Sequence, residues 1–137
     1  MIKAPLLALL LLSGCSVELA DSADEEARQS LKNYGLSRCL LDSQPEEASA
    51  LREDLATASQ AYHFMGNGAH RIVQNENSLE TLHDPYQATR DFVLNRYAVT
   101  GSAMKSASGS SAFYACLAIY NSAEFDEFVR TQNAYLP

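Results

Sequence analysis

Basic residues are scarce in this chain, and they are not clustered. Of its 137 residues, 10 are Lys or Arg and 17 are Asp or Glu, which gives a formal net charge of −7. Contacts with a nucleic-acid backbone need clustered Lys and Arg, so we exclude nucleic acid as a partner. The acidic balance either serves solubility alone or favours encounter with a basic protein. Tryptophan is also absent, but a hydrophobic content of 47% is sufficient for the core of one small domain.

The spacings of a metal centre are missing as well. His63, His70 and His83 do not form a His-Glu-x-x-His motif. Cys39 and Cys116 lack the close partners that the cysteines of zinc knuckles have. We therefore expect neither a metal nor a cofactor.

A catalytic constellation is also lacking. Gly66–Gly68 follows a helical pattern instead of a strand, unlike a phosphate-binding loop. Ser102 and Lys105 match the S-x-x-K pattern of penicillin-interacting enzymes, in which the lysine assists activation of the serine. Those enzymes carry further motifs on a larger α/β scaffold, and this chain has neither. We expect a binding protein and not an enzyme.

Residues 1–14 have the composition of a secretory signal peptide. Lys3 gives a short positive start, Leu6–Leu12 is apolar, and Ser13 and Gly14 are small. The apolar run is too short to remain as a membrane-spanning anchor. Removal of this segment deletes Lys3 alone, so the remaining nine basic and seventeen acidic residues give a net charge of −8.

The end of this segment, Leu12-Ser-Gly-Cys15, resembles the lipobox of bacterial lipoproteins. The resemblance implies cleavage before Cys15 and lipid attached to that residue. The residue after Cys15 is Ser16 and not an aspartate, which implies that the lipoprotein is sorted to the outer membrane. We therefore expect a periplasmic protein that is lipid-anchored through Cys15, with residues 15–21 as a tether. The alternative is an ordinary signal peptide that is cleaved elsewhere.

Two cysteines remain for the folded part of the exported chain. With Cys15 acylated, Cys39 and Cys116 are two thiols in an oxidising compartment, and we predict that they pair. Closing so long a loop stabilises a fold by roughly 4 kcal/mol in the chain-entropy description. The alternative is a pair of separate buried thiols that act as small hydrophobes.

Capping residues divide residues 22–137 into helices. Ser22, Ser43, Asp84 and Ser122 each stand where a side-chain oxygen can accept a hydrogen bond from the first turn of a helix. No stretch of useful length alternates as a strand does. We therefore expect a single all-α domain, a compact bundle of about five to seven short helices stapled by one disulfide.

Apolar periodicity predicts which faces of these helices are buried. Phe113, then Cys116 or Leu117, and Tyr120 form one stripe. Gly35 allows another helix to approach closely. Ala69–His83 is interpreted as two helical pieces. The helix expected after Ser43 has an inward stripe of Ala48, Leu51, Leu55, Ala58, Tyr62 and Met65.

The segment Thr100–Ser111 differs from the rest of the chain. Its residues are small and polar, it contains two glycines, and it has neither a helical nor a strand period. A loop of this length is uncommon in so small a domain. It is either a binding loop or a merely mobile connection.

Two segments carry a family pattern. Residues 31–40 read LKNYGLSRCL, and residues 116–125 read CLAIYNSAEF. They resemble the type VI secretion amidase immunity proteins, which have a tyrosine-bearing helix ending in Ser-x-Cys and a C-terminal helix reading roughly Cys-Ile-Asp-Leu-Tyr-x-Ser-x-Glu-Leu. The resemblance covers roughly residues 29–130, and it departs from the family at Ala118 and Phe125, where aspartate and leucine are usual.

The resemblance implies a small all-helical periplasmic protein that is often a dimer. Such proteins bind a cognate peptidoglycan amidase toxin of the papain-like Cys–His type and fill its active-site cleft with a helix and a protruding loop. Cys39 and Cys116 would then be structural. Carried onto this chain, the partner-binding residues would be Gly101, Ser102, Lys105, Ser106, Ser108, Gly109 and Ser110.

A second function class shares the same sequence features. A non-enzymatic envelope lipoprotein that acts as a scaffold or adaptor for another protein would also be exported, acidic and helical. The two functions differ in their partner, which is a toxin in one case and a harmless protein in the other.

Overall fold

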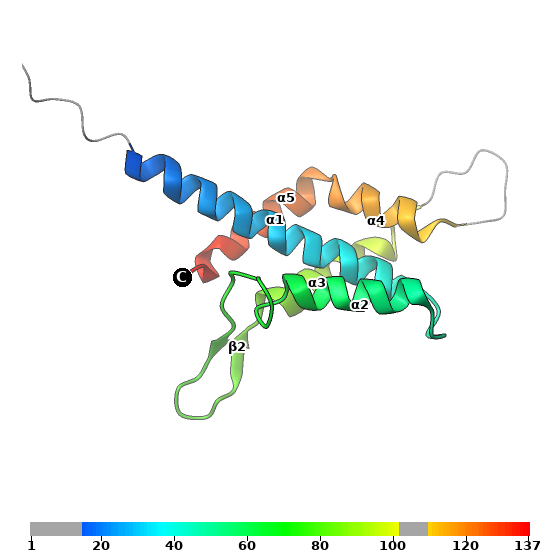
Figure 1. Cartoon of the computed structure of the whole chain (residues 1–137), viewed down its shortest axis with the longest axis horizontal. Coiled ribbons are helices and arrows are strands. Elements are labelled where there is room, and N and C mark those ends of the chain that lie inside the picture. Colours follow the sequence, from blue (N-terminus) through cyan, green and yellow to red (C-terminus); the bar gives the residue numbers. More distant parts are fainter. Residues whose placement is uncertain (1–14, 102–109) are drawn as a thin grey trace, which may run out of the picture.

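A long first helix runs through the middle of the molecule (Figure 1). The computed structural model describes residues 15–101 and 110–137, with the side chains of the first helix described from Leu19 onward. The α-helices of this part are α1 (Cys15–Ser43), α2 (Ala50–Tyr62), α3 (Pro85–Tyr97), α4 (Ala112–Tyr120) and α5 (Ala123–Thr131), followed by the 3-10 helix η1 (Gln132–Tyr135).

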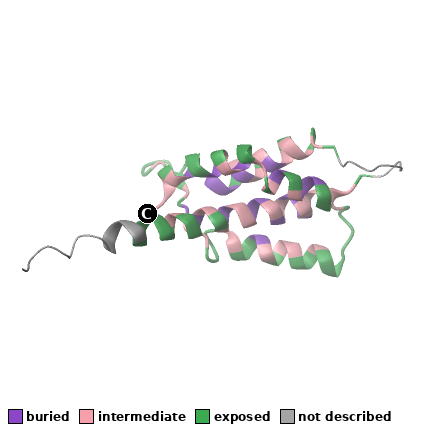
Figure 2. Ribbon diagram, turned by 90° about the horizontal axis from the view of Figure 1, so that it is seen from above, coloured by how far each residue is buried: buried purple, intermediate pink, exposed green. Residues whose placement is uncertain are grey.

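The other helices are distributed unequally over the two sides of α1. Seen from above, α2 lies along one side of α1, and the other helices lie along the opposite side (Figure 2). Buried residues gather on that second side, where the core lies. The predicted all-α bundle is therefore confirmed, although α1 is longer than the short helices that we expected. The core consists of Leu31, Tyr34, Cys39, Tyr86, Val93, Cys116, Ile119, Phe125 and Val129.

The predicted disulfide is present. Cys39 of α1 and Cys116 of α4 are bonded, with their Cα atoms 5.8 Å apart, and both are buried. The alternative of two separate thiols is wrong. Because the bond joins residues that are 77 positions apart, it fixes the later helices against α1.

Gly35 confirms the expectation of close helix packing. A Cβ atom at this position would lie 2.6 Å from Cζ of Phe125 and 3.0 Å from Cγ2 of Thr89. The first contact is closer than carbon atoms tolerate, and the second is tight. The absent side chain thus lets α3 and α5 approach α1.

Two of the four predicted helix starts are confirmed. Asp84 accepts hydrogen bonds from the backbone N–H groups of Tyr86 and Gln87, and Ser122 accepts one from Phe125. Each cap satisfies N–H groups that have no partner within their helix.

The other two starts are wrong. α1 begins at Cys15, so the segment expected to be a tether is helical, and Ser22 lies inside the helix with its hydroxyl donating to the carbonyl of Leu19. α2 begins at Ala50, capped by Ser49 instead of Ser43. Ser43 is still part of α1, which leaves residues 44–49 as the turn between the two helices.

Two predicted stripes are only partly buried. In α2, Leu51 is 56% exposed and Met65, beyond its end, is exposed as well, since this helix packs mainly on α1 and buries only Ser59 fully. In α4 the buried residues are Ala115, Cys116 and Ile119, and Phe113 is 61% exposed.

The interpretation of residues 69–83 as two helical pieces is wrong. The strands β1 (Val73–Gln74) and β2 (Thr81–His83) pair antiparallel as a hairpin that projects from the bundle (Figure 1). The side-chain oxygen of Asn75 accepts hydrogen bonds from the N–H groups of Asn77 and Ser78. This turn reverses the chain within the segment that we expected to be helical.

Candidate functional site

The described ends of the predicted binding loop lie at the surface. Gly101 and Ser110 are exposed, and a Cβ atom on Gly101 would meet no other heavy atom within 4 Å. The remaining proposed contacts, Ser102, Lys105, Ser106, Ser108 and Gly109, lie outside the described residues, as do residues 1–14 and the side chain of Cys15.

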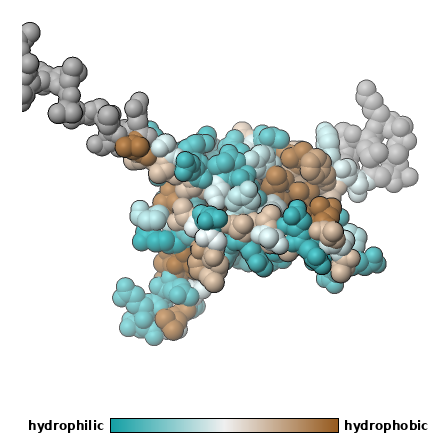
Figure 3. All heavy atoms as spheres, viewed as in Figure 1, coloured by the Kyte–Doolittle hydropathy of each residue, from teal (hydrophilic) through white to brown (hydrophobic). Residues whose placement is uncertain are grey.

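Exposed apolar side chains flank the two ends of this loop. Val99 follows α3, and Phe113 and Tyr114 lie in the first turn of α4; all three are exposed. We call these three residues the loop-end patch. Apolar surface is visible over α4 close to the loop (Figure 3). Exposed apolar surface of this kind is a feature of many protein–protein contacts.

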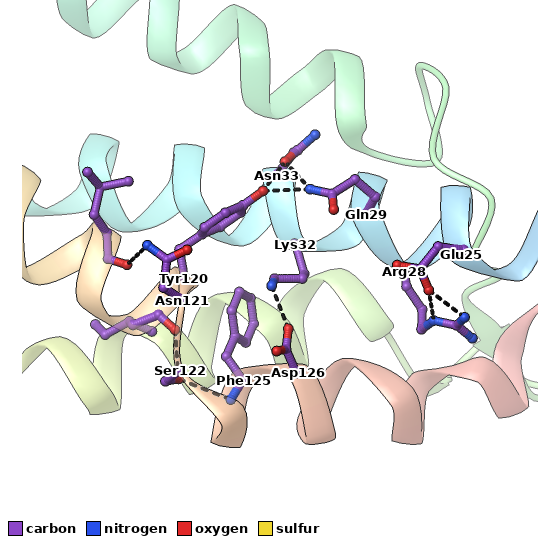
Figure 4. A network of polar contacts seen from close by, with 12 residues as sticks. Glu25, Arg28, Gln29, Lys32, Asn33, Tyr120, Asn121, Ser122, Phe125 and Asp126 are labelled. Atoms are coloured by element: carbon purple, nitrogen blue, oxygen red, sulfur yellow. Dashed lines mark hydrogen bonds and ion pairs between the residues drawn. The ribbon is translucent and has the colours of Figure 1, made fainter.

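A polar network joins α1 to the last residue of α4 and to the first turn of α5 (Figure 4). Lys32 pairs with Asp126, and its ammonium group lies 4.6 Å from the ring centroid of Tyr120. The hydroxyl of Tyr120 donates to the side chain of Asn33, and Gln29 donates to Tyr120 in turn. These contacts hold the two segments that carry the family resemblance against each other.

A second ion-pair cluster ties α1 to α3. The carboxylate of Asp42 accepts hydrogen bonds from Arg38 on its own helix and from Arg90 on α3, with nitrogen–oxygen distances of 2.8 Å. The hydrogen bond with Asp42 raises the pKa of Arg90. Bidentate or shared carboxylate contacts of this kind are directional, so they fix the register of the two helices.

A cluster of aromatic and histidine side chains surrounds Tyr86 in the first turn of α3. The hydroxyl of Tyr86 donates to the backbone carbonyl of His70 over 3.1 Å, and the ring of Tyr86 packs edge-on against Tyr34. Burial raises the pKa of Tyr86 to about 12 and lowers the pKa of His70 to about 4. Burial also lowers the pKa of His63 and raises that of Tyr34.

This cluster is suited to a structural role. His70 is 2% exposed and neutral at pH 7, and solvent does not reach it. Sequence analysis missed the burial of Tyr86, whose partners come from elsewhere in the chain.

Other kinds of site in the described residues would be a metal site, a membrane-spanning helix or a groove. Within the described residues, no group of three or more His, Cys, Asp or Glu side chains could hold a metal ion. In the same part of the chain, no helix combines the length and the apolarity needed to cross a membrane. An open groove between α1 and α2 is lined mostly by alanines, with Glu26 and Tyr62 among the remaining residues.

Sequence analysis also missed the exposed apolar residues of the hairpin, Leu79 and Leu82. A signal for the hairpin was present, since Asn75–Ser78 is rich in turn-forming residues and separates two short apolar runs.

Comparison with protein-family models, with curated proteins and with solved structures finds no match for this chain.

Proposed function

We propose that this protein is an immunity protein that binds a peptidoglycan amidase toxin of type VI secretion and sterically blocks its active-site cleft. The observation that carries the proposal is the disulfide-braced contact between α1 and α4. It brings together residues 31–40 and 116–125, the two segments that resemble this family.

Blocking a cleft requires a preformed body and not a reactive group. The core, the disulfide and the Lys32–Asp126 pair restrict how the helices can move. A binder that is already ordered loses less conformational entropy on association, which favours affinity. The acidic net charge of −7 suits a basic partner surface and speeds encounter with it.

The family resemblance would place contacts with the toxin on the loop residues Gly101, Ser102, Lys105, Ser106, Ser108, Gly109 and Ser110. Small side chains let the backbone enter a narrow groove. The loop-end patch adds apolar surface beside them.

The proposed location is the periplasm, with a lipid on Cys15 that addresses the protein to the outer membrane. An anchored inhibitor would stay beside the cell wall that its toxin attacks. A single acyl chain binds a membrane weakly, so this anchor needs more than one chain.

The test begins with the neighbouring gene, because genes of such immunity proteins lie beside that of their toxin. We expect periplasmic expression of the neighbouring amidase to lyse cells, and co-expression of this protein to prevent lysis. A variant without residues 1–14 is the matched control and should not protect, since it stays in the cytoplasm. Equal lysis with and without the exported protein would refute the proposal and favour a scaffold lipoprotein.

A further inference from the structure

The β1–β2 hairpin presents large apolar side chains to solvent. Leu79 is 72% exposed and Leu82 is 61% exposed. The hairpin projects from the bundle, and its far end shows apolar surface among hydrophilic residues (Figures 1 and 3). Exposed apolar residues on a projecting hairpin add nothing to the core, and they invite aggregation unless a partner covers them.

The backbone at Leu79 is held in an unusual conformation. Its φ angle is 58°, in the left-handed region that leucine disfavours and that Gly or Asn adopts at lower cost. The N–H of Leu79 donates to the carbonyl of Asn75, and the N–H of Asn75 donates to the carbonyl of Glu80. The turn is therefore preformed, and it carries a leucine where folding alone favours a different residue.

The base of the hairpin is anchored to the end of the chain. The ring of His83 stacks on Tyr135 with centroids 3.9 Å apart, and its Nε2 atom shares a hydrogen bond with Gln132. Arg71 donates from its backbone to the carbonyl of Tyr135 and from its side chain to that of Leu136. These contacts hold the hairpin at a fixed orientation relative to the bundle.

The charge of the hairpin defines the chemistry of its partner. Glu76 and Glu80 flank Leu79 and are exposed, and residues 72–82 contain no Lys or Arg. Neither glutamate forms an ion pair within the described part of the chain. A complementary surface would combine an apolar recess with basic groups around it.

We infer that the tip of this hairpin, residues 75–80, enters the cleft of the amidase, with Leu79 in an apolar recess and Glu76 and Glu80 facing basic groups at its rim. The inference rests on the proposed function and names the surface that performs it. It assigns the entering element to the hairpin instead of the segment between α3 and α4. The hairpin and the start of α4 lie near different ends of the bundle (Figure 1).

Leu79→Asn is the test variant, because asparagine tolerates the left-handed backbone but lacks the apolar side chain. Leu51→Asn is the matched control, since it makes the same exchange at an exposed leucine on α2. We expect Leu79→Asn to weaken binding to the purified amidase by roughly 30-fold or more, the scale of a hot-spot residue. Leu51→Asn should leave the dissociation constant unchanged, and both variants should keep the circular dichroism of the wild type.

Replacement of Glu76 and Glu80 by lysine tests the charge. Reversing both charges should slow association and reduce its dependence on salt. Unchanged association kinetics would contradict the assignment of basic groups to the rim.

The outcomes separate the two proposals. If the wild type binds the amidase and Leu79→Asn binds equally well, the hairpin is not the entering element, and the proposed function survives. Loss of binding by Lys105→Glu with Ser106→Trp alone would place the contact on the loop and overturn the inference. If the wild type does not bind the amidase, the proposed function itself fails. If Leu79→Asn abolishes only self-association, the hairpin binds a second copy of the chain.

Discussion

At the scale of single residues, His70 couples folding to pH. Its Nε2 atom has no hydrogen-bond partner among the described residues, and burial lowers its pKa to about 4 from the usual 6.5. The carboxylate of Asp24 opposes this effect in part. As pH falls from 6.5 towards 4, the unfolded chain binds a proton that the folded chain excludes.

We therefore predict that stability is lost between about pH 6.5 and pH 4, with His70 contributing at most roughly 3 kcal/mol. His70→Gln should flatten this part of the profile, whatever it does to stability at pH 7. Urea denaturation of both proteins at several pH values measures the two slopes. His63 is present in both proteins, so its effect on the pH dependence is the same in each. Parallel stability profiles would therefore mean that His70 contributes nothing.

At the scale of elements, α3 and α5 pack closely against α1 at Gly35. Alanine at this position would gain about 1 kcal/mol of helix propensity. Its Cβ would lie 2.6 Å from Phe125, which is fully buried and stacked near Phe92, so that the ring has little room to move. Overpacking of a core costs about 1–3 kcal/mol.

We predict that Gly35→Ala lowers the free energy of unfolding by up to about 2 kcal/mol, because overpacking outweighs the gain in propensity. Gly101→Ala is the control, since its Cβ meets nothing within 4 Å and its stability should be unchanged. Thermal or urea denaturation of the two variants provides the comparison. A more stable Gly35→Ala protein would show that α5 can shift without loss.

The elements also show what the sequence could predict. Caps at Asp84 and Ser122 were predictable because they depend on a few neighbouring residues. The start of α2 was not predictable in this way, because α1 continues through Ser43 and α2 therefore begins only at Ala50. The hairpin was missed because short apolar runs suit a strand as well as a helix, and only the turn at Asn75 decides between them.

Prediction of the candidate site was limited for a different reason. The loop that contains residues 102–109 was chosen for its composition, which is independent of what surrounds it. The exposure of Leu79 and Phe113 depends instead on whether another element of the folded bundle packs over these side chains. Sequence periodicity reports an apolar side chain but does not say whether another element covers it.

At the scale of the whole molecule, the disulfide makes stability depend on the compartment. Cys39 and Cys116 are separated by 77 residues, and a loop of that size contributes roughly 4 kcal/mol to stability in the chain-entropy description. A domain of this size has a total stability of about 5–15 kcal/mol. The bond therefore supplies a large share of what keeps the helices together.

We predict that replacing both Cys39 and Cys116 by alanine lowers the free energy of unfolding by roughly 4 kcal/mol, and that reductant has a similar effect on the wild type. Reductant should not affect the double variant further, which is the internal control. Denaturant unfolding of residues 15–137 with and without reductant measures both effects. A loss below about 1 kcal/mol would mean that core packing alone holds α4 against α1. In that case the reduced chain would fold as well as the oxidised one, and a failure of the variant without residues 1–14 to protect cells would not reflect misfolding.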